Sequence, residues 1–249
     1  MRLARLTIHG QGDACTQMAL DEAMAVYAGL RGEALLRLYW FNPPAVTIGY
    51  FQRLEEAVDM REAENLGISV VRRVTGGGSV YHDPHAELVY SVAAPEDWLP
   101  ASTREAFRAI LEWLLDALRS LGIEPQLSGV NDIIVDGRKV SGNAQARLYG
   151  AVLQHGTILL EAKRELMERV LRVPRGKGWR PAQRVAGLRD LGYSVTREEL
   201  IEALRASAER WAEKLDAKLV EEDALPSVVY RLGGSLRWKY CSREWLTKR

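Results

Sequence analysis

The sequence predicts one α+β domain that is built on a largely antiparallel, mixed sheet flanked by helices. Three observations lead to this prediction: several short apolar runs typical of strands, amphipathic helical patterns interspersed between them, and a strong two-residue hairpin signal at Asp136-Gly137. The chain has 249 residues, 47% of them hydrophobic, which is enough to bury one sizeable core. We assign residues 1–225 to the main domain and residues 226–249 to a C-terminal appendage of the same domain.

The N-terminal half predicts strands separated by three helices. Asn42-Pro43-Pro44 divides two apolar runs, because neither a central strand nor a helix tolerates such a sequence. Ser102 with Glu105 is typical of a capping box that opens a helix ending at Gly122. The other expected helices span residues 13–30 and 54–65, and the expected strands span residues 2–8, 34–41, 45–51, 68–74 and 87–94.

The C-terminal half returns to strands between Asn131 and Leu160 and then becomes helical. A helix is expected near residues 162–171, followed by an irregular basic segment at residues 173–184. A second capping box, Thr196 with Glu199, opens a long helix.

Composition excludes several classes of protein. The 34 basic and 33 acidic side chains nearly cancel, so neither nucleic acid nor an anionic membrane is an expected partner. Neither a signal peptide nor a run of about 18 apolar residues is present in the sequence. Two cysteines, Cys15 and Cys241, form neither a metal-ligand spacing nor a disulfide framework, and a reducing cytoplasm is the expected location.

The predicted turn at Asp136-Gly137 fixes a register for the hairpin around it. In a two-residue turn the flanking residues pair directly, and each further pair lies one step outward on both strands. The predicted pairs are Val135 with Arg138, Ile134 with Lys139, Ile133 with Val140, and Asp132 with Ser141.

Side-chain alternation gives this hairpin one apolar face and one polar face. The polar face carries the carboxylate of Asp132, the ammonium of Lys139 and the hydroxyl of Ser141. The Cα atoms of Asp132 and Lys139 are expected roughly 7 to 8 Å apart, too far for a guaranteed salt bridge but suited to two groups that grip one ligand. A lysine on a solvated hairpin is the common alternative. The small polar sequence SGNAQ that follows favours a ligand site.

Three consecutive glycines stand between two predicted strands in RRVTGGGSVYHD, residues 72–83. Glycines allow positive φ angles and close approach of a ligand, and they leave N–H groups free to point at an anion. The sequence matches neither a Walker-type phosphate loop nor the dinucleotide fingerprint. Arg73 and Thr75 supply a charge and a hydroxyl beside the glycines, whereas lone histidines such as His82 and His155 are more often structural.

Three motifs, in this order and at these intervals, resemble the lipoate-protein ligase A family of the biotin and lipoate ligase superfamily: RRVTGGGSVYHD, NDIIVDGRKVSGNAQ and LQHGTILL. MALDEAM, LRLYWFNPPAVTIGYFQ, RVAGL and KYCSREW extend the resemblance over nearly the whole chain. The resemblance implies the catalytic-domain fold of that superfamily and a cytoplasmic enzyme that joins lipoate to ATP. It implies transfer of the lipoyl group from lipoyl-adenylate to a lysine of a carrier domain, in a 2-oxoacid dehydrogenase E2 or the glycine cleavage H protein.

The resemblance also implies roles for individual residues. Lys139 is the expected catalytic cation, because attack of one anion on another needs a positive charge that stabilises the transition state. Asp132 is a candidate Mg²⁺ ligand, and Trp40, Val71 and Val80 are candidates for lining an acyl tunnel. The resemblance assigns lipoate binding to Gly77, Gly78, His82, Lys139 and His155. It assigns binding of ATP and the adenylate to Arg73, Thr75, Gly76, Gly77, Gly78, Ser79, Val80, Tyr81, His82 and Lys139.

The chain departs from the family pattern in three places, one of which is Glu161 and Lys163, where an aspartate is common. Pro84 and His85 follow His82-Asp83, where a small residue followed by Asn or Asp is usual, so the conformation of that corner is open. Many of these ligases continue past KYxSxEW into a small accessory domain, whereas this sequence stops at Arg249. We therefore expect a separate partner subunit that carries the accessory domain.

Three alternatives remain open. A lipoyl or octanoyl transferase acts from an acyl carrier protein through a cysteine thioester, and no cysteine lies between Cys15 and Cys241. A biotin ligase usually has Lys-Trp-Pro before Asn-Asp, where this chain has Ser128-Gly129-Val130. A non-catalytic module that binds lipoate or lipoyl domains would have no need of Lys139.

Overall fold

The computed structural model describes residues 1–172 and 181–248. Within these residues an eight-stranded mixed sheet has the order β11-β1-β2-β6-β10-β9-β8-β7. β1 is parallel to both β11 and β2, and the remaining neighbours are antiparallel. This confirms the predicted α+β class with a largely antiparallel sheet. The strands are β1 (Arg2–Gly12), β2 (Ala34–Phe41), β6 (Glu87–Pro95), β7 (Gln126–Ser128), β8 (Asp132–Val135), β9 (Arg138–Leu148), β10 (Ala151–Leu159) and β11 (Ala217–Glu222).

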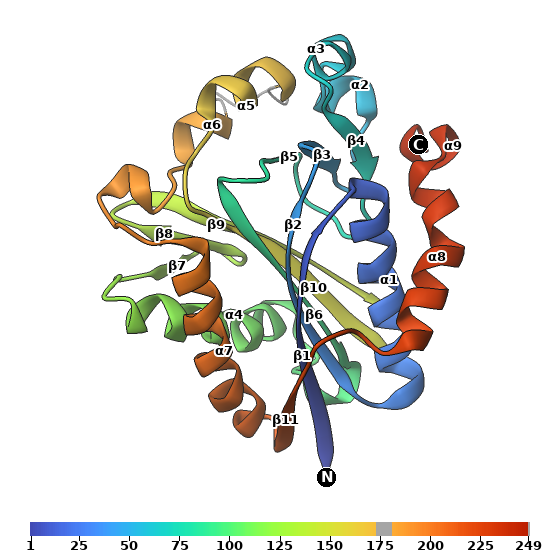
Figure 1. Ribbon diagram of the computed structural model, residues 1–249, viewed down its shortest axis with the longest axis vertical. Coiled ribbons are helices and arrows are strands. Elements are labelled where there is room, and N and C mark those ends of the chain that lie inside the picture. Colours follow the sequence, from blue (N-terminus) through green and yellow to red (C-terminus); the bar gives the residue numbers. More distant parts are fainter. Residues whose placement is uncertain (173–180, 249) are drawn as a thin grey trace.

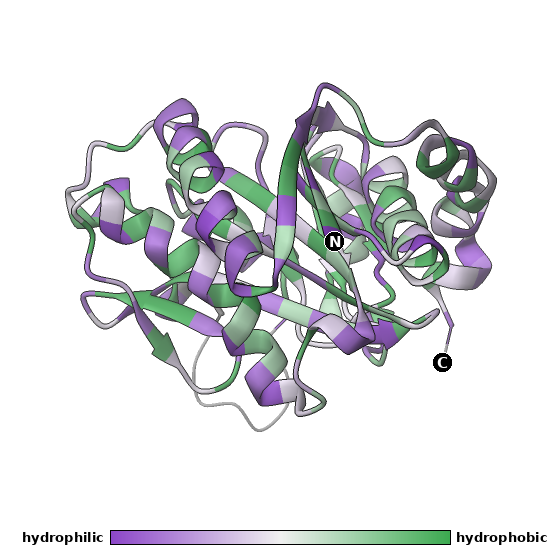
Figure 2. Cartoon of the chain, turned by 90° about the horizontal axis from the view of Figure 1, so that it is seen from below, coloured by the Kyte–Doolittle hydropathy of each residue, from purple (hydrophilic) through white to green (hydrophobic). Residues whose placement is uncertain are grey.

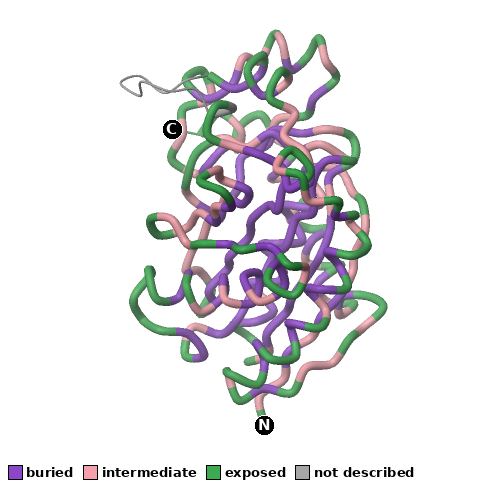
Figure 3. The backbone as a smooth tube through the Cα atoms, turned by 90° about the vertical axis from the view of Figure 1, so that its left-hand side faces the viewer, coloured by how far each residue is buried: buried purple, intermediate pink, exposed green. Residues whose placement is uncertain are grey.

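Helices cover both faces of the large sheet (Figure 1). α4 (Thr103–Ser120) and α7 (Arg197–Lys214) bury the larger core on one face, where the indole N–H of Trp113 donates to the carbonyl oxygen of Leu204 at 2.7 Å. α1 (Ala14–Arg31) and α8 (Ser227–Cys241) cover the other face. Figure 2 shows hydrophilic and hydrophobic bands on these helices, and Figure 3 shows buried positions running through the centre of the chain. The sheet is therefore buried from both sides.

A small sheet of order β4-β3-β5 lies at one end of the large sheet and holds the glycine-rich segment between β4 and β5. The predicted helix over residues 54–65 is two helices. Its backbone breaks because Val58 forms a bridge with Leu171 and the Asp59 side chain accepts the N–H of Glu62 at 3.2 Å as a new helix cap. The elements here are β3 (Ala45–Ile48), β4 (Ser69–Arg72), β5 (Val80–His82), α2 (Leu54–Ala57), α3 (Met60–Asn65) and α5 (Arg164–Val170).

The remaining elements are short. They are the 3-10 turns η1 (Glu96–Trp98) and η2 (Arg189–Leu191), and the helices α6 (Pro181–Arg184) and α9 (Arg243–Leu246). The irregular segment predicted at residues 173–184 lies outside the described residues up to position 180, and its last four residues are helical.

Helix capping follows the sequence signals to different degrees. Thr196 and Glu199 form a complete capping box, because the Thr196 hydroxyl accepts the N–H of Glu199 and the Glu199 carboxylate accepts the N–H of Thr196. At the start of α4 the Ser102 hydroxyl accepts the N–H of Glu105 at a longer 3.5 Å. The aliphatic face of α4 against the sheet therefore contributes more to its stability than this cap does.

The hairpin register differs from the prediction beyond the first two pairs. Val135 pairs with Arg138 and Ile134 with Lys139, as expected, but the register then shifts by one residue. The extra residue in β9 is a β-bulge, which lets its neighbours keep their apolar side chains in the core. As a result Ile133 pairs with Ser141, and Asp132 pairs with Gly142 instead of Ser141.

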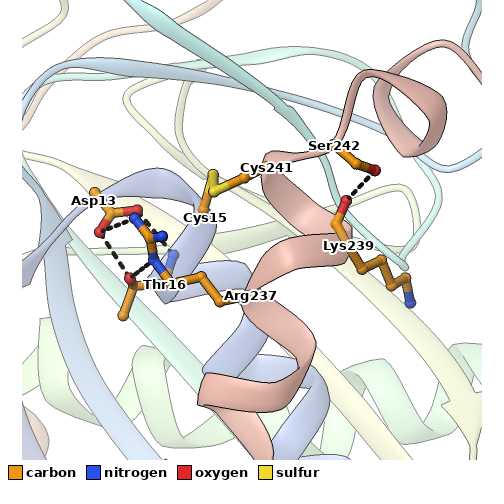
Figure 4. The surroundings of a disulfide bond; sticks show 7 residues. All are labelled: Asp13, Cys15, Thr16, Arg237, Lys239, Cys241 and Ser242. Carbon is orange, nitrogen blue, oxygen red and sulfur yellow. Dashed lines mark hydrogen bonds and ion pairs between the residues drawn. A yellow bond between two sulfur atoms is a disulfide. The ribbon is translucent and has the colours of Figure 1, made fainter.

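The C-terminal segment packs on α1 and is joined to it by a disulfide between Cys15 and Cys241 (Figure 4). The expectation that the two cysteines form no disulfide is wrong, because packing of α8 on α1 brings their Cα atoms within 5.4 Å. Buried Glu22 of α1 accepts hydrogen bonds from Lys239 at 2.7 Å and from the Tyr240 hydroxyl at 2.6 Å. Residues 227–241 are therefore an integral part of one face of the fold.

None of the helices in the described part of the chain is long and apolar enough to cross a membrane.

Candidate active site

Two adjoining cavities lie between the glycine loop, residues 73–79, and strands β8 to β10. The inner cavity has a volume of about 130 Å³ and the outer one about 310 Å³. Lys139 lines both, so its ammonium stands where they meet. The other shared lining residues are Gly78, Ser79, Val80, Asn131, Gly142 and Thr157.

The wall of the inner cavity contains both apolar and polar side chains. Of the apolar ones, Met18 comes from α1, Phe41 from the end of β2 and Val89 from β6, and each of them is buried. A pocket that combines buried apolar side chains with polar groups is suited to a small ligand that has a hydrocarbon body and a polar head. The chemistry of its wall fits an aliphatic carboxylic acid.

The outer cavity has three cationic side chains in its wall. Arg172 and Arg184 line it together with Lys139, and Asp132 is the only carboxylate that lines either cavity among the described residues. Arginine and lysine side chains favour phosphate oxygens. This wall fits an anionic, phosphate-bearing ligand.

Lys139 forms an ion pair with Asp132, which the predicted separation of their Cα atoms did not guarantee. Its Nζ is 2.6 Å from Oδ1 of Asp132, and the β-bulge places Asp132 opposite Gly142. The lysine stem lies over Gly142, where a Cβ atom would be 2.7 Å from both Cε and Nζ. The glycine in SGNAQ therefore provides the space that the catalytic candidate occupies.

The glycine loop packs backbone against backbone. Gly77 has a φ of +93°, a conformation that favours glycine, and a Cβ added to Gly49 would lie 2.1 Å from the carbonyl oxygen of Gly77. Gln52 holds the same corner, because its Oε1 accepts the N–H of Gly49 at 2.8 Å and its Nε2 donates to Ser79 Oγ at 3.2 Å. Gly49, which lies outside the predicted glycine loop, is thus as necessary for this packing as the glycines within the loop.

Arg73 is buried in the wall of the inner cavity with neutral partners. Among the described residues Arg73 donates hydrogen bonds to the hydroxyl and carbonyl oxygens of Thr47, to the hydroxyl of Thr75 and to the carbonyl oxygens of Gly76 and Gly78. Burial lowers the pKa of Arg73 to about 10, so the side chain is cationic at neutral pH. Among the described residues no carboxylate contacts this buried guanidinium, so its positive charge is not neutralised by a neighbouring anion.

The predicted site residues fall into three groups. Thr75 and Gly76 line neither cavity, although both contact Arg73. Tyr81 and Asp132 line the outer cavity. The predicted residues that line the inner cavity are Arg73, Gly77, Gly78, Ser79, Val80, His82, Lys139 and His155.

Both histidines at the inner cavity are engaged through both ring nitrogens. His155 Nδ1 lies 2.7 Å from Asp21 Oδ2 and its Nε2 lies 2.7 Å from Thr75 Oγ1. His82 has the corresponding contacts with Glu87 and Thr47. The structural role expected of a lone histidine is therefore present at both positions, at the wall of the cavity.

The three residues that are candidates for lining an acyl tunnel lie in different parts of the structure. Val80 lines both cavities, whereas Val71 packs in a core cluster beneath α1 and Trp40 stacks with Arg197 at 4.5 Å. Sequence reasoning missed Met18, Phe41 and Val89, whose only signal is apolar character in segments that alternate between two faces. Which face meets the cavity depends on the packing of α1 against the sheet.

A site for Mg²⁺ has one protein ligand at most in this region. No group of three or more His, Cys, Asp or Glu side chains in the described residues is placed to hold a metal ion. Asp132 supplies a carboxylate beside the cationic outer cavity. This arrangement fits Mg²⁺ only in its usual mode of binding through one carboxylate and the phosphates of a substrate.

Comparison with known proteins gives a consistent family. Residues 13–209 match the lipoyl protein ligase A/B catalytic domain. Octanoyltransferase LipM of Kyrpidia tusciae is 36% identical over 277 aligned positions, which cover 98% of both chains. The bi-partite lipoate protein ligase of Thermoplasma acidophilum superposes with a TM-score of 0.86 at 30% identity, over 99% of this chain and 97% of that one.

A lipoate-protein ligase A bound with ATP superposes with a TM-score of 0.84 at 30% identity, over 99% of both chains. The relative in sequence is thus named a transferase, and the neighbours in structure are named ligases. Both names denote enzymes of lipoyl-type protein modification. This chain belongs to the lipoyl protein ligase A/B catalytic-domain family.

Proposed function

We propose that the chain is an ATP-dependent lipoate-protein ligase. The observation that carries the proposal is that Lys139 lines both cavities, of which the inner one contains buried apolar side chains and the outer one two arginines, with no cysteine among the residues that line either one. An acyl-adenylate has the same division into a hydrocarbon part, a central anhydride and a nucleotide. The acyl chain would occupy the inner cavity and the nucleotide the outer one.

In the first step a carboxylate oxygen of lipoate attacks the α-phosphorus of ATP, and pyrophosphate leaves with the electrons of the broken P–O bond. The two reactants are anions, so the ammonium of Lys139 stabilises the transition state more than the separated reactants. Mg²⁺ bound by Asp132 and the phosphates would neutralise charge on the leaving group. Arg73 would add a fixed positive charge at the cavity wall.

In the second step the neutral amine of a carrier lysine attacks the acyl carbon, the C–O bond to AMP breaks, and AMP and the proton of the amine leave as the amide bond forms. Lys139 would hold the carbonyl oxygen while negative charge develops on it. The carrier must reach the junction from outside. The likeness to a bi-partite lipoate protein ligase that is described together with its E2 lipoyl domain supports lipoyl domains as the acceptor.

A second candidate, octanoyl transfer, is favoured by the names of the sequence relatives, which are octanoyltransferases. Transfer through a thioester requires a free cysteine thiolate beside the acyl group. Cys15 and Cys241 are joined to each other, and neither lines the cavities that contain Lys139. We therefore favour the adenylate route for this chain.

One experiment separates the two candidates. A lipoyl domain is incubated with the protein, with and without the candidate accessory subunit, and either lipoate, ATP and Mg²⁺ or octanoyl acyl carrier protein without ATP, and its mass is measured. With the accessory subunit present we expect modification with lipoate and ATP, accompanied by release of pyrophosphate. Modification from octanoyl carrier protein alone would support the transferase, and modification in neither reaction, nor from supplied lipoyl-adenylate, would support a binding module.

The first step requires a further test because a bi-partite neighbour covers nearly the same length of chain. We propose that a separate accessory subunit assists adenylate formation. The isolated chain should transfer the lipoyl group from supplied lipoyl-adenylate and should form the adenylate poorly on its own. Full ATP-dependent lipoylation by the isolated chain would contradict the requirement for a partner.

Lys139→Ala tests the proposed role of the ammonium. Loss of one such transition-state contact lowers the rate about 100-fold to 1000-fold. Lys163→Ala is a matched control, because Lys163 is paired with Glu161 at 2.6 Å and lines neither of the two cavities. Equal activity of Lys139→Ala and the wild type, with lipoyl-adenylate as donor, would exclude the proposed role in transfer.

A further inference from the structure

Two buried carboxylates connect to Arg73 through matching chains of hydrogen bonds. In each chain a carboxylate contacts Nδ1 of a histidine, Nε2 of that histidine contacts a threonine hydroxyl, and the hydroxyl accepts an N–H of Arg73. The first chain is Asp21, His155, Thr75 and Arg73, with distances of 2.7, 2.7 and 3.1 Å. The second is Glu87, His82, Thr47 and Arg73, with distances of 2.8, 3.0 and 3.2 Å.

The direction of the hydrogen bonds in the first chain follows from its ends. The Asp21 carboxylate accepts, so Nδ1 of His155 carries the proton and Nε2 is an acceptor. The Thr75 hydroxyl then donates to Nε2 of His155. The lone pairs of the hydroxyl oxygen remain free to accept the Nε–H of Arg73. Burial lowers the pKa of His155, which keeps the ring neutral, as this arrangement requires.

Arg73 in turn fixes the glycine loop. Its Nη2 donates to the carbonyl oxygens of Gly76 at 2.6 Å and Gly78 at 2.8 Å. Because a trans peptide group is planar, the N–H that follows each carbonyl points away from Arg73. The orientation of two peptide groups in the loop therefore depends on the position of this one guanidinium.

We propose that Asp21 is a positioning residue for the anion-binding loop, acting through His155, Thr75 and Arg73. Asp21 lines neither cavity and is almost fully buried in α1, so it acts without touching a ligand. The proposal rests on the proposed function where it concerns ATP, which is the anion that the loop would bind. It also gives MALDEAM, a motif without a role in the catalytic steps, a task in the site.

The two carboxylates differ in a way that allows a matched test. Both oxygens of Asp21 are used, because Oδ1 accepts from Arg37 at 2.7 Å and Oδ2 accepts from His155 and from the Tyr39 hydroxyl at 3.0 Å. An amide at this position must turn its NH₂ toward one of these donors. Glu87 uses Oε1 for His82, whereas Oε2 has no partner among the described residues. An amide at position 87 can therefore keep its oxygen on His82.

The experiment compares Asp21→Asn, Glu87→Gln and Glu22→Gln in the full chain. Glu22 is the next residue of α1 and is also buried. Its carboxylate accepts hydrogen bonds from Lys239, Tyr149 and Tyr240, and none of these three residues is a hydrogen-bond partner of Arg73. ATP affinity is measured by calorimetry, and amide hydrogen exchange is measured across residues 74–79. We expect Asp21→Asn to weaken ATP binding and to accelerate exchange in this loop, each at least tenfold. The two glutamine variants should stay within about twofold of the wild type.

Two outcomes would overturn the proposal: wild-type loop exchange in Asp21→Asn, or equal acceleration in Glu22→Gln. If the wild type fails to bind ATP, the proposed function is wrong, and loop exchange alone decides whether Asp21 positions the loop. If Asp21→Asn fails to fold, Thr75→Val and Thr75→Ser replace it. Serine keeps the connecting hydroxyl and should retain slow loop exchange, whereas valine keeps the shape without the hydroxyl and should lose it.

Discussion

Removal of the disulfide between Cys15 and Cys241 should lower the free energy of unfolding without abolishing the fold. The two cysteines are 226 positions apart. In the chain-entropy treatment a crosslink that closes so long a loop stabilises the folded state by about 5 kcal/mol at most. Residual compactness of the unfolded chain reduces this value, so we expect a loss of about 2 to 4 kcal/mol. For a chain of this size that corresponds to a fall in Tm of about 5 to 15 °C.

The test compares the wild type with the double variant Cys15→Ser and Cys241→Ser, each with and without reductant. The fold should persist in the variant, because Lys239 and Tyr240 still donate to Glu22 and α8 still covers α1. The reduced wild type should match the variant, and the variant itself should not respond to reductant. A loss below about 1 kcal/mol would refute the argument from loop closure.

Two other predictions address the glycine corner and the dependence of stability on pH. Gly49→Ala should lower the rate of ATP-dependent lipoylation at least tenfold while retaining the fold, because its Cβ would lie 2.1 Å from the carbonyl oxygen of Gly77. Wild-type activity would show that the backbone at Gly49 and Gly77 can shift without loss of function. Burial lowers the pKa of His9 from 6.5 to about 4, so the unfolded chain binds more protons between these values and acid favours unfolding. The His9 contribution is present above pH 6.5 and is lost as the pH falls toward 4. The free energy of unfolding of His9→Asn, measured by denaturant titration, should therefore fall less steeply than that of the wild type as the pH is lowered from 6.5 to 4. An equally steep fall would contradict the assignment.

Local signals in the sequence predicted the parts of the fold that local forces determine. Asp136-Gly137 forms the expected tight turn with both φ angles positive, and Thr196 caps its helix as its spacing with Glu199 indicates. The regions that differ depend on contacts between distant segments. The register shift beyond Ile134 and the meeting of Cys15 with Cys241 both depend on tertiary packing, which no short window of sequence contains.

The candidate site shows the same division. Lys139 and the glycine loop could be selected from the sequence because charge and backbone freedom are properties of single residues or short runs. The partners that hold Arg73 could not, because Asp21 and His155 are 134 positions apart and meet only after α1 packs on β10. Thr75 was selected as a ligand contact, but its hydroxyl lies between His155 and Arg73 and lines neither cavity.

The glycine run therefore has a second physical role besides admitting a ligand. Its bare backbone lets the loop approach Gly49 closely and wrap two carbonyl groups around Arg73, which puts a cation in the wall without a carboxylate in direct contact. Desolvation of that cation opposes folding, and it is offset only by hydrogen bonds to neutral oxygens. An anion bound in the inner cavity would meet a charge whose desolvation was completed during folding. By linkage, such binding would also stabilise the fold.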